Sequence, residues 1–384
     1  MSRILLDVSR LLTRLHDGLL PTGVDRVGLA YLKRYSRQAR AVLSERGHSI
    51  ALCERDSQRI FEMLLSGKFD RITLCKVIAR HWLNTPRKSD GVSGVLLHTS
   101  HNGIEYARYH ESMRRRNVRG VFMIHDLIPL THAEYCRPAV DVQHRKRIRT
   151  ALSHAHGLIA NSEDTLRALE SEAALAGLPM PASVVAHLAS GVIAHAPMPA
   201  PLTAPYFLML GTIEPRKNHW FMLHVWRRII ELLGESAPKL VIVGRRGWEC
   251  ENVIDMLERC HLLRTHVIER SDCSDDELHG WIQHARALLF PAFVEGYGMP
   301  LVEALALKTP VLASNLEVFE EIAGDIPDYL DPLDGPAWIG RIRAYAEARS
   351  PERDAQIKRI EGFREPTWEE HFARVDPFVE ALAQ

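Results

Sequence analysis

Short, uninterrupted apolar runs alternate with helix-length stretches along this chain, and this alternation restricts its fold more than any other feature. The runs of the first half are RILLDVS (3–9), GVLLHTS (94–100), GVFMIHD (120–126), GLIANS (157–162) and SVVAHLA (183–189). Those of the second half are YFLMLGT (206–212), KLVIVG (239–244), THVIE (265–269), ALLFP (287–291) and PVLAS (310–314). Strands that are apolar at every position belong to parallel sheets covered by helices on both faces. The sequence therefore predicts an α/β protein with doubly wound sheets, which bind ligands at the carboxyl ends of their strands.

A proline-rich stretch divides the chain nearly in half. Residues 196–205 read APMPAPLTAP, and the prolines break helices and favour extended backbone. With 384 residues, the chain is too long for one ordinary core. We therefore expect one domain over 1–195, a linker over 196–205, and a second domain over 206–365 that faces the first across a cleft. A tail helix over 366–384 is expected to pack back on the first domain.

The composition restricts the partners and the compartment. Lys and Arg together number 48, as do Asp and Glu, and this neutral balance gives no electrostatic case for nucleic-acid binding. The six cysteines include no C-x-x-C pair, which argues against a disulfide framework or zinc module and favours a reducing cytosol. The opening MSRILLDVSRLL is too charged for a signal peptide, and no run of about 18 apolar residues could span a bilayer. We expect a cytoplasmic protein.

The most informative stretch follows the run ALLFP and reads AFVEGYGMPLVEAL. Gly296 and Gly298 let a ligand approach backbone N–H groups, and Pro300 suits the first turn of a helix, where free N–H groups bind anions. Because phosphate repels carboxylates, Glu295 and Glu303 are expected to face sugar hydroxyls, from which carboxylates accept hydrogen bonds. The stretch therefore suits a nucleotide sugar, which carries both phosphate and polyol.

Three other stretches carry candidate groups. Arg216 and Lys217, in TIEPRKN, stand before a helix start, which is unfavourable for cations unless an anion such as a diphosphate binds there. His125 follows the run GVFMI and either contacts an incoming hydroxyl or is a structural histidine, one of 20 in the chain. Gly23, in LLPTGVDRVGLAYL, precedes an amphipathic stretch and could present backbone N–H groups to a phosphate.

Together these stretches resemble the group-1 (family 4) glycosyltransferases of the GT-B fold, in which two Rossmann-like domains face each other across a cleft. The resemblance rests first on EGYGMPLVE (295–303), whose two glutamates are separated by seven residues. It extends to TGVDRV (22–27), HDLIPL (125–130), GTIEPRKN (211–218), LVIVGRRGW (240–248), SDDEL (274–278) and TWEEHFARV (367–375). The resemblance implies that the first domain binds the acceptor and the second binds the nucleotide sugar.

The resemblance also assigns roles to single residues. Arg216 and Lys217 would hold the donor diphosphate, Glu303 the ribose, and Glu295 the transferred sugar. His125 would lie on the acceptor side, near the anomeric carbon. The other donor-binding positions implied are Gly23, Val24, Gly211, Thr212, Gly244, Ser271, Gly296, Tyr297, Gly298, Met299, Pro300 and Leu301. The sequence departs from the family pattern at Asp25. This residue adds negative charge in a loop that commonly carries two glycines in the family.

The resemblance implies retention of anomeric configuration. We expect a same-face transfer through an oxocarbenium-like state, in which the departing phosphate, steadied by Arg216 and Lys217, takes the acceptor proton. The sequence has no D-x-D motif, so we expect neither a metal nor a cofactor beyond the nucleotide-sugar substrate. HDLIPL resembles members that use GDP-mannose or GDP-rhamnose in bacterial polysaccharide assembly. We therefore expect a hexosyl, preferably mannosyl, transfer to a glycan or lipid-linked glycan.

Two rival functions and one surface question remain open in the sequence. GYGMPL begins like a dinucleotide-binding motif of an NAD-dependent oxidoreductase, but Leu301 occupies the place of the third glycine. A non-catalytic scaffold with the GT-B fold is the second rival. The basic clusters at 114–116 and 145–149 are either solvated faces or contacts with an anionic inner membrane leaflet.

Overall fold

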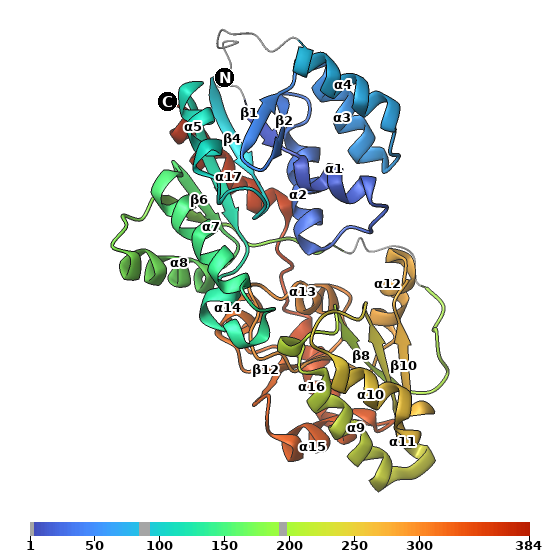
Figure 1. Ribbon diagram of the computed structural model, residues 1–384. Coiled ribbons are helices and arrows are strands. Elements are labelled where there is room, and N and C mark those ends of the chain that lie inside the picture. Colours follow the sequence, from blue (N-terminus) through green and yellow to red (C-terminus); the bar gives the residue numbers. More distant parts are fainter. Residues whose placement is uncertain (1–3, 84–92, 192–197) are drawn as a thin grey trace. The chain divides into compact units, whose positions relative to one another are not determined.

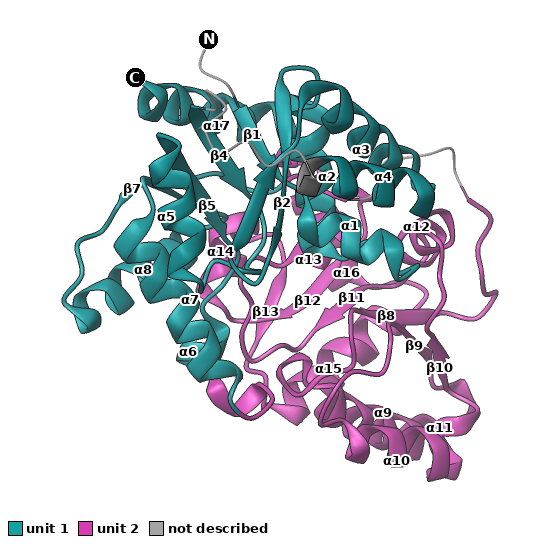
Figure 2. Ribbon diagram, turned by 45° about the horizontal axis from the view of Figure 1, so that its top comes forward, with its two compact units in different colours: residues 1–131, 139–188, 367–384 teal, residues 132–138, 189–366 magenta. Residues whose placement is uncertain are grey.

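The computed structural model describes residues 4–83, 93–191 and 198–384. The chain forms two compact units, neither of which is contiguous in sequence (Figure 2). Unit 1 contains Met1–Thr131, Ala139–Leu188 and Thr367–Gln384, and unit 2 contains His132–Pro138 and Ala189–Pro366. Ala196 and Pro197, which open the predicted linker, lie outside the described residues.

In the described part of unit 1, strands form one sheet in the order β3-β2-β1-β4-β5-β6-β7 (Figure 1). The strands are β1 (Ile4–Asp7), β2 (Ala39–Glu45), β3 (His48–Ala51), β4 (Gly94–His98), β5 (Val118–Ile124), β6 (Gly157–Ala160) and β7 (Ala182–Val185). Neighbouring strands are parallel except β2 and β3, which form an antiparallel hairpin. The apolar runs of the first half supply β1, β4, β5, β6 and β7, as the sequence predicted.

The helices of unit 1 include one from the far end of the sequence. They are α1 (Ser9–His16), α2 (Gly23–Tyr35), α3 (Glu54–Ser66), α4 (Arg71–Leu83), α5 (Ala107–Arg115), α6 (Ile128–Thr131), α7 (Val140–His154), α8 (Glu163–Ala176) and α17 (Trp368–Ala383). A capping box of Thr367 and Glu370 starts α17, and His371 on its buried face lies 2.9 Å from the Tyr31 hydroxyl. A Cβ atom at Gly157 would stand 2.5 Å from Leu382, so this glycine gives α17 room to pack against the sheet.

In the described part of unit 2, a fully parallel sheet has the order β10-β9-β8-β11-β12-β13. Its strands are β8 (Tyr206–Leu210), β9 (Lys239–Val243), β10 (Val267–Arg270), β11 (Leu288–Phe290), β12 (Val311–Ser314) and β13 (Asp328–Leu330). Its helices are α9 (His219–Leu233), α10 (Glu251–Arg259), α11 (His261–Arg264), α12 (Asp275–Gln283), α13 (Met299–Ala306), α14 (Glu317–Ala323), α15 (Gly335–Ala346) and α16 (Pro351–Ile360). Three 3₁₀ turns complete it: η1 (Ala133–Tyr135), η2 (Pro215–Lys217) and η3 (Gly234–Ser236).

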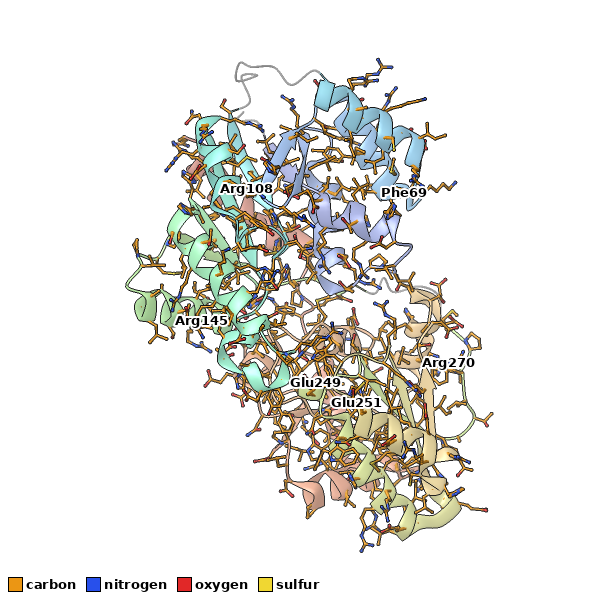
Figure 3. All side chains as sticks on the ribbon, in the orientation of Figure 1. Phe69, Arg108, Arg145, Glu249, Glu251 and Arg270 are labelled. Carbon is orange, nitrogen blue, oxygen red and sulfur yellow. The ribbon has the colours of Figure 1, made fainter. Side chains whose placement is uncertain are left out.

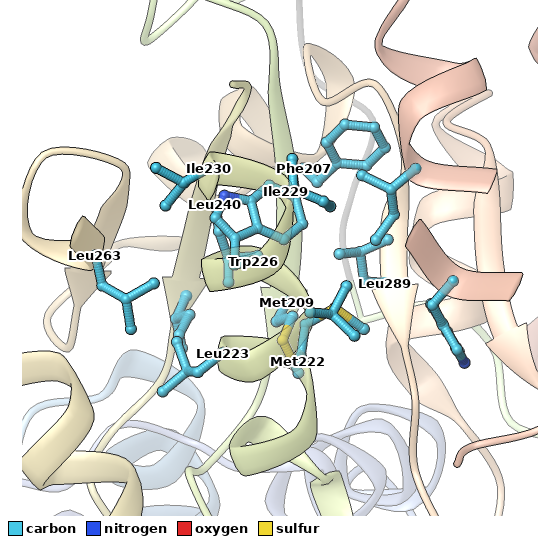
Figure 4. Close-up of a cluster of buried hydrophobic side chains, with 14 of the residues drawn as sticks. Phe207, Met209, Met222, Leu223, Trp226, Ile229, Ile230, Leu240, Leu263 and Leu289 are labelled. Carbon is cyan, nitrogen blue, oxygen red and sulfur yellow. The ribbon is translucent and has the colours of Figure 1, made fainter. Parts of the chain in front are cut away.

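Alternate side chains of β8 build two separate cores, one on each face of the sheet. Phe207 and Met209 point into a cluster with Trp226 of α9, whose indole N–H donates to the Pro238 carbonyl at 3.0 Å (Figure 4). Tyr206 and Leu208 point into the opposite cluster. A strand buried on both faces must be apolar throughout, which explains the runs in the sequence. The predicted α/β fold with two doubly wound sheets is confirmed.

No helix in the described ranges combines the length and hydropathy that a bilayer-spanning segment needs.

Candidate functional site

Two loops of unit 2 meet at the point where its strand order reverses, between β8 and β11. Open α/β sheets bind ligands at this switch point, beyond the carboxyl ends of the strands. Strand β8 leads into 211–217, and β11 leads into 291–298. The main chain joins the two loops, because the N–H of Phe293 donates to the carbonyl of Arg216 at 2.9 Å. These loops contain eight of the candidate residues that the sequence indicated, among them Arg216, Lys217 and Glu295.

Two cations and two carboxylates form a compact cluster in these loops. Arg216 Nε lies 2.6 Å from Glu214 Oε1, and Arg216 Nη1 lies 2.5 Å from Glu295 Oε1. Lys217 Nζ donates to the same oxygen of Glu295 and stands 4.6 Å from the centre of the Phe290 ring. The structure thus brings together the two predicted diphosphate ligands and one predicted sugar ligand. It adds Glu214, which the sequence analysis did not consider although it lies two residues before Arg216.

Burial makes the charges of this cluster interdependent. Glu214, Lys217 and Glu295 are each less than a tenth exposed. Burial raises the pKa of Glu214, and the nearby cations only partly offset this. Burial also acts to raise the pKa of Glu295, but the charges of Arg216 and Lys217 outweigh it, so this pKa lies below its ordinary value. Glu295 is therefore a carboxylate whose ionised form depends on both cations.

Close backbone contact positions the loop after β8. Gly211 has φ +115°, in the region that favours glycine, and its N–H donates to the Val243 carbonyl at 2.9 Å. A Cβ atom at Gly244 would stand 1.9 Å from the carbonyl oxygen of Gly211. Gly211 and Gly244, both predicted in the donor site, therefore pack backbone to backbone. Thr212 follows Gly211 in the same loop and is half-buried.

The loop after β11 turns sharply into α13. Gly298 has φ +102° and caps the helix, with Met299 and Pro300 in its first turn. Tyr297, Leu301 and Glu303 are buried, whereas Gly296, Met299 and Pro300 are half-buried. Glu303 lies one turn inside α13, as the sequence predicted for a helix beginning near Pro300. Ser271 is placed differently, because it follows β10, and β9 lies between β10 and β8 in the sheet.

In unit 1, Gly23 begins α2 and Val24 follows it in the first turn. Asp25, the acid that departs from the family pattern, is buried and faces cations of α1. Its carboxylate lies 2.8 Å from Arg10 and 3.0 Å from Arg14. It also accepts from the backbone N–H and the hydroxyl of Thr22, both at 2.7 Å, which completes a capping box. The negative charge of Asp25 is thus compensated by two arginines within unit 1.

His125, at the carboxyl end of β5, is held by three contacts within unit 1. Its Nε2 lies 2.9 Å from the Thr99 carbonyl, so Nε2 carries the proton and Nδ1 is left as an acceptor. Its backbone N–H donates to His101 Nε2 at 3.0 Å, and its carbonyl accepts from Asn161 at 2.9 Å. Burial lowers the pKa of His125, which keeps the ring neutral. A neutral imidazole whose Nδ1 is an acceptor suits contact with a hydroxyl group.

Two histidines beside His125 were not predicted. The His101 ring lies between His125, with ring centres 5.3 Å apart, and His144, with ring centres 5.1 Å apart. Burial lowers the pKa of both His101 and His144. His101 follows β4 by three residues, so applying the strand-end rule to GVLLHTS would have found it. His144 is in the middle of α7, and no local pattern in the sequence indicates it.

The basic cluster at 145–149 is largely paired with acids. Arg145, which is labelled in Figure 3, lies 3.0 Å from Glu172, and Arg149 lies 2.8 Å from the same residue. Arg147 lies 3.5 Å from Glu105. In the other cluster, Arg115 lies 3.5 Å from Glu111. These ion pairs reduce the positive charge that the clusters offer to a membrane.

The environment of His219 leads to a prediction about pH. This residue is the first of α9 and follows the N-cap residue Asn218. It is 2% exposed, and neither ring nitrogen has a hydrogen-bond partner among the residues that the structure describes. Burial, with the charge of Lys217, lowers its pKa to about 3. Below pH 6.5 the unfolded chain therefore binds a proton that the folded chain does not, and stability falls as the pH falls. The decrease in the free energy of unfolding caused by this residue should approach about 1.4 kcal/mol per pH unit.

Replacing His219 with leucine should remove this contribution. Urea unfolding at pH 7.5 and pH 5.5 should show a smaller drop in the free energy of unfolding for His219→Leu than for the parent protein. An equal drop in both proteins would contradict the assigned environment.

Comparisons of the sequence with known proteins give one family and a set of relatives. Residues 193–326 match the family described as "Glycosyl transferases group 1". The chain is 31% identical over 242 residues to the "Serotype-specific mannosyltransferase WbdA" of Escherichia coli, a match that covers 59% of this chain and 29% of that protein. The chain thus spans less than a third of the length of this relative.

Solved structures show where the fold recurs. Sucrose-phosphate synthase from Thermosynechococcus elongatus is similar with a TM-score of 0.66 and 16% identity, over 100% of this chain and 99% of that one. Alr3699/HepE of Anabaena, solved with UDP-glucose, is similar with a TM-score of 0.64 and 13% identity, over 100% of this chain and 98% of that one. At these identities the likeness concerns the fold.

Proposed function

Residues 193–326 belong to the group-1 glycosyltransferases, within a chain that has the GT-B fold, and from this premise we propose that the protein transfers a hexosyl group from a nucleotide sugar to a glycan. The observation that carries the proposal is the pair Arg216 and Lys217, held against Glu295 at the switch point of unit 2. Mannose from GDP-mannose is the proposed donor sugar, because the relative WbdA is named a mannosyltransferase. The proposed acceptor is a cell-surface glycan, either free or lipid-linked.

Donor binding is proposed to work by an exchange of partners within the cluster. The two cations and the carboxylates of Glu214 and Glu295 balance one another. A diphosphate brings its own negative charge and accepts from Arg216 and Lys217 in place of Glu295. Glu295 is then free to accept hydrogen bonds from the hydroxyls of the transferred sugar. Glu303, in the first turns of α13, is proposed to hold the ribose.

The proposed chemistry retains the anomeric configuration. As the bond between sugar and phosphate lengthens, negative charge grows on the diphosphate beside Arg216 and Lys217, and the ring becomes oxocarbenium-like. The departing phosphate oxygen takes the proton of the acceptor hydroxyl, which attacks from the same face of the sugar. Because the two cations stabilise the leaving group, we expect no metal requirement. His125, with its Nδ1 acceptor, is proposed to orient the acceptor hydroxyl.

The oxidoreductase alternative is not favoured. Leu301 fills the place of the third glycine of a dinucleotide motif and is fully buried, so it is part of the core beneath the loop. The comparisons also indicate glycosyltransferases. A scaffold without activity would keep the fold and lose the transfer, so an activity assay separates it from the proposal.

The donor is tested by thermal unfolding in the presence of GDP-mannose, UDP-glucose, ADP-glucose and the free nucleotides. We expect GDP-mannose to raise the melting temperature most, with a shift that grows with the logarithm of its concentration. At a concentration of 100 Kd the stabilisation is about 2.7 kcal/mol. Transfer of labelled mannose to a manno-oligosaccharide then tests catalysis.

Two controls sharpen this experiment. Lys217→Met should lose the GDP-mannose shift, whereas Arg228→Ala, which removes an exposed cation of α9, should keep it. A larger shift with UDP-glucose would replace mannose as the proposed sugar. Melting temperatures that do not respond to any nucleotide sugar at millimolar concentration would contradict the proposal.

A further inference from the structure

Unit 2 carries an open groove on its helical layer. Helices α9 and α10 form its sides and α11 closes one end, in the group of three helices seen together in Figures 1 and 2. Its volume is about 570 Å³. Met222, Leu223 and Trp226 turn one face of α9 into the core, so Trp220 and His224 lie on the opposite, outward face. The groove is thus separate from the cluster around Glu295.

An exposed aromatic ring forms one wall of the groove. Trp220 is 43% exposed, and its ring is fixed edge-on against His224, with centroids 4.6 Å apart and planes at 80°. Leu262 of α11 is also exposed on the lining, and Met256 of α10 is buried below it. The exposed indole of Trp220 offers a large flat apolar face to a ligand.

Each arginine of the lining lies beside a carboxylate, so the groove offers hydrogen-bonding groups with little unpaired charge. Arg259 lies 2.6 Å from Asp255 one turn earlier on α10, and Arg227 lies 3.3 Å from Glu231. Asn252, also on α10, adds an amide with both donors and an acceptor. The scattered polar groups also interrupt the continuous apolar surface that an amphipathic helix requires.

From this combination we infer that the groove binds a neutral glycan. One face of a pyranose ring consists of C–H groups and stacks on an indole, while its hydroxyls both donate and accept hydrogen bonds. Trp220 supplies the stacking surface, and Asn252, Asp255 and Arg259 supply the polar partners. The identity of the glycan rests on the proposed function: the groove would hold a distant part of the acceptor while its end is extended at the catalytic site.

The test uses the full-length protein and linear mannotetraose as the probe, with binding measured by saturation-transfer NMR and titration calorimetry. Trp220→Ala should weaken the binding of mannotetraose about tenfold, because the variant lacks the aromatic anchor. Asn252→Ala should weaken it less. Leu232→Ala is the matched control, because Leu232 lies on another face of α9 and is 46% exposed, and its affinity should equal that of the parent. Mannosyl transfer to methyl mannoside should be the same in Trp220→Ala as in the parent, since one sugar held at the catalytic site does not also occupy the groove, whose lining shares no residue with the cluster around Glu295.

The outcomes separate this inference from the proposed function. Tetraose binding that depends on Trp220, in a protein that transfers no sugar, would support the groove and contradict the transferase. Active transfer with equal tetraose affinity in Trp220→Ala and Leu232→Ala would overturn the groove. Failure of the parent protein to bind mannotetraose or maltotetraose, together with binding of an apolar helical peptide, would also overturn it.

Discussion

Lys217→Met should lower kcat/KM for sugar transfer by about two orders of magnitude while the protein stays folded. Methionine keeps the buried aliphatic volume and removes the charge that Lys217 Nζ places on Glu295. Loss of one preorganised donor at a developing negative charge costs about 3 kcal/mol in the transition state. Arg216 still contacts Glu295, at 2.5 Å, so the carboxylate keeps one cation. Initial rates with GDP-mannose over a range of concentrations measure the effect.

The control for this prediction is Arg228→Ala. Arg228, a cation of α9, is likewise paired with a carboxylate, at 3.1 Å from Glu231, but both side chains are exposed. Exposed ion pairs of this kind contribute about 0.2–1 kcal/mol to stability. This pair lies outside the cluster, so the rate of sugar transfer should be unchanged. A melting temperature for each variant separates lost catalysis from lost folding. Parent-like kinetics in Lys217→Met would show that this cation does not act on the donor phosphate.

Gly244→Ala should destabilise the protein by about 3 kcal/mol, near the upper end of what overpacking costs. The new methyl group would stand 1.9 Å from the carbonyl oxygen and 2.6 Å from the carbonyl carbon of Gly211. Both neighbours are backbone, so no side chain can move aside, and either β9 or the loop after β8 must shift. Because that loop leads to Arg216 and Lys217, affinity for the donor should fall as well.

Gly340→Ala provides a comparison with the opposite expected sign. Gly340 is inside α15, and apart from its chain neighbours and the backbone of its own helix, no described atom lies within 4 Å of the position of its added Cβ. The same substitution there should raise stability by about 0.5–1 kcal/mol, because alanine favours helix and restricts the unfolded chain. Denaturant unfolding of both variants measures the difference. Equal stabilities would mean that Gly211 and Gly244 do not pack as closely as described.

The sequence predicted the buried strands better than the edge strands. Each apolar run gave one strand, because a strand covered on both faces has no polar position. The strands β2, β3 and β13 were missed. Arg40, Ser44 and Glu45 interrupt the apolar pattern of β2, while β3 and β13 lie at sheet edges and need little apolar surface. Short edge strands are defined mainly by their hydrogen-bonded neighbours, which a local pattern does not show.

For the candidate site, the sequence indicated the residues but not their pairing. The strand-end rule identified Arg216, Lys217 and Glu295 separately, from two stretches far apart in the chain. One oxygen of Glu295 contacts both cations. This arrangement depends on the 3₁₀ turn Pro215–Lys217 and on the hydrogen bond between Phe293 and Arg216. The contact between the His101 and His125 rings likewise depends on β4 and β5 being neighbours, which the topology sets. The roles of these residues in transfer stay predictions.

The place of α17 has a consequence for biosynthesis. Phe378 and Leu382 fill the space left by Gly157, so the sheet of unit 1 is covered by residues that the ribosome makes after all of unit 2. A nascent chain that has released the first 188 residues therefore exposes an apolar sheet surface until the final helix emerges. Stalled or truncated chains should consequently recruit chaperones through the first unit, and expression of that unit in isolation should require residues 367–384 supplied in trans or by fusion.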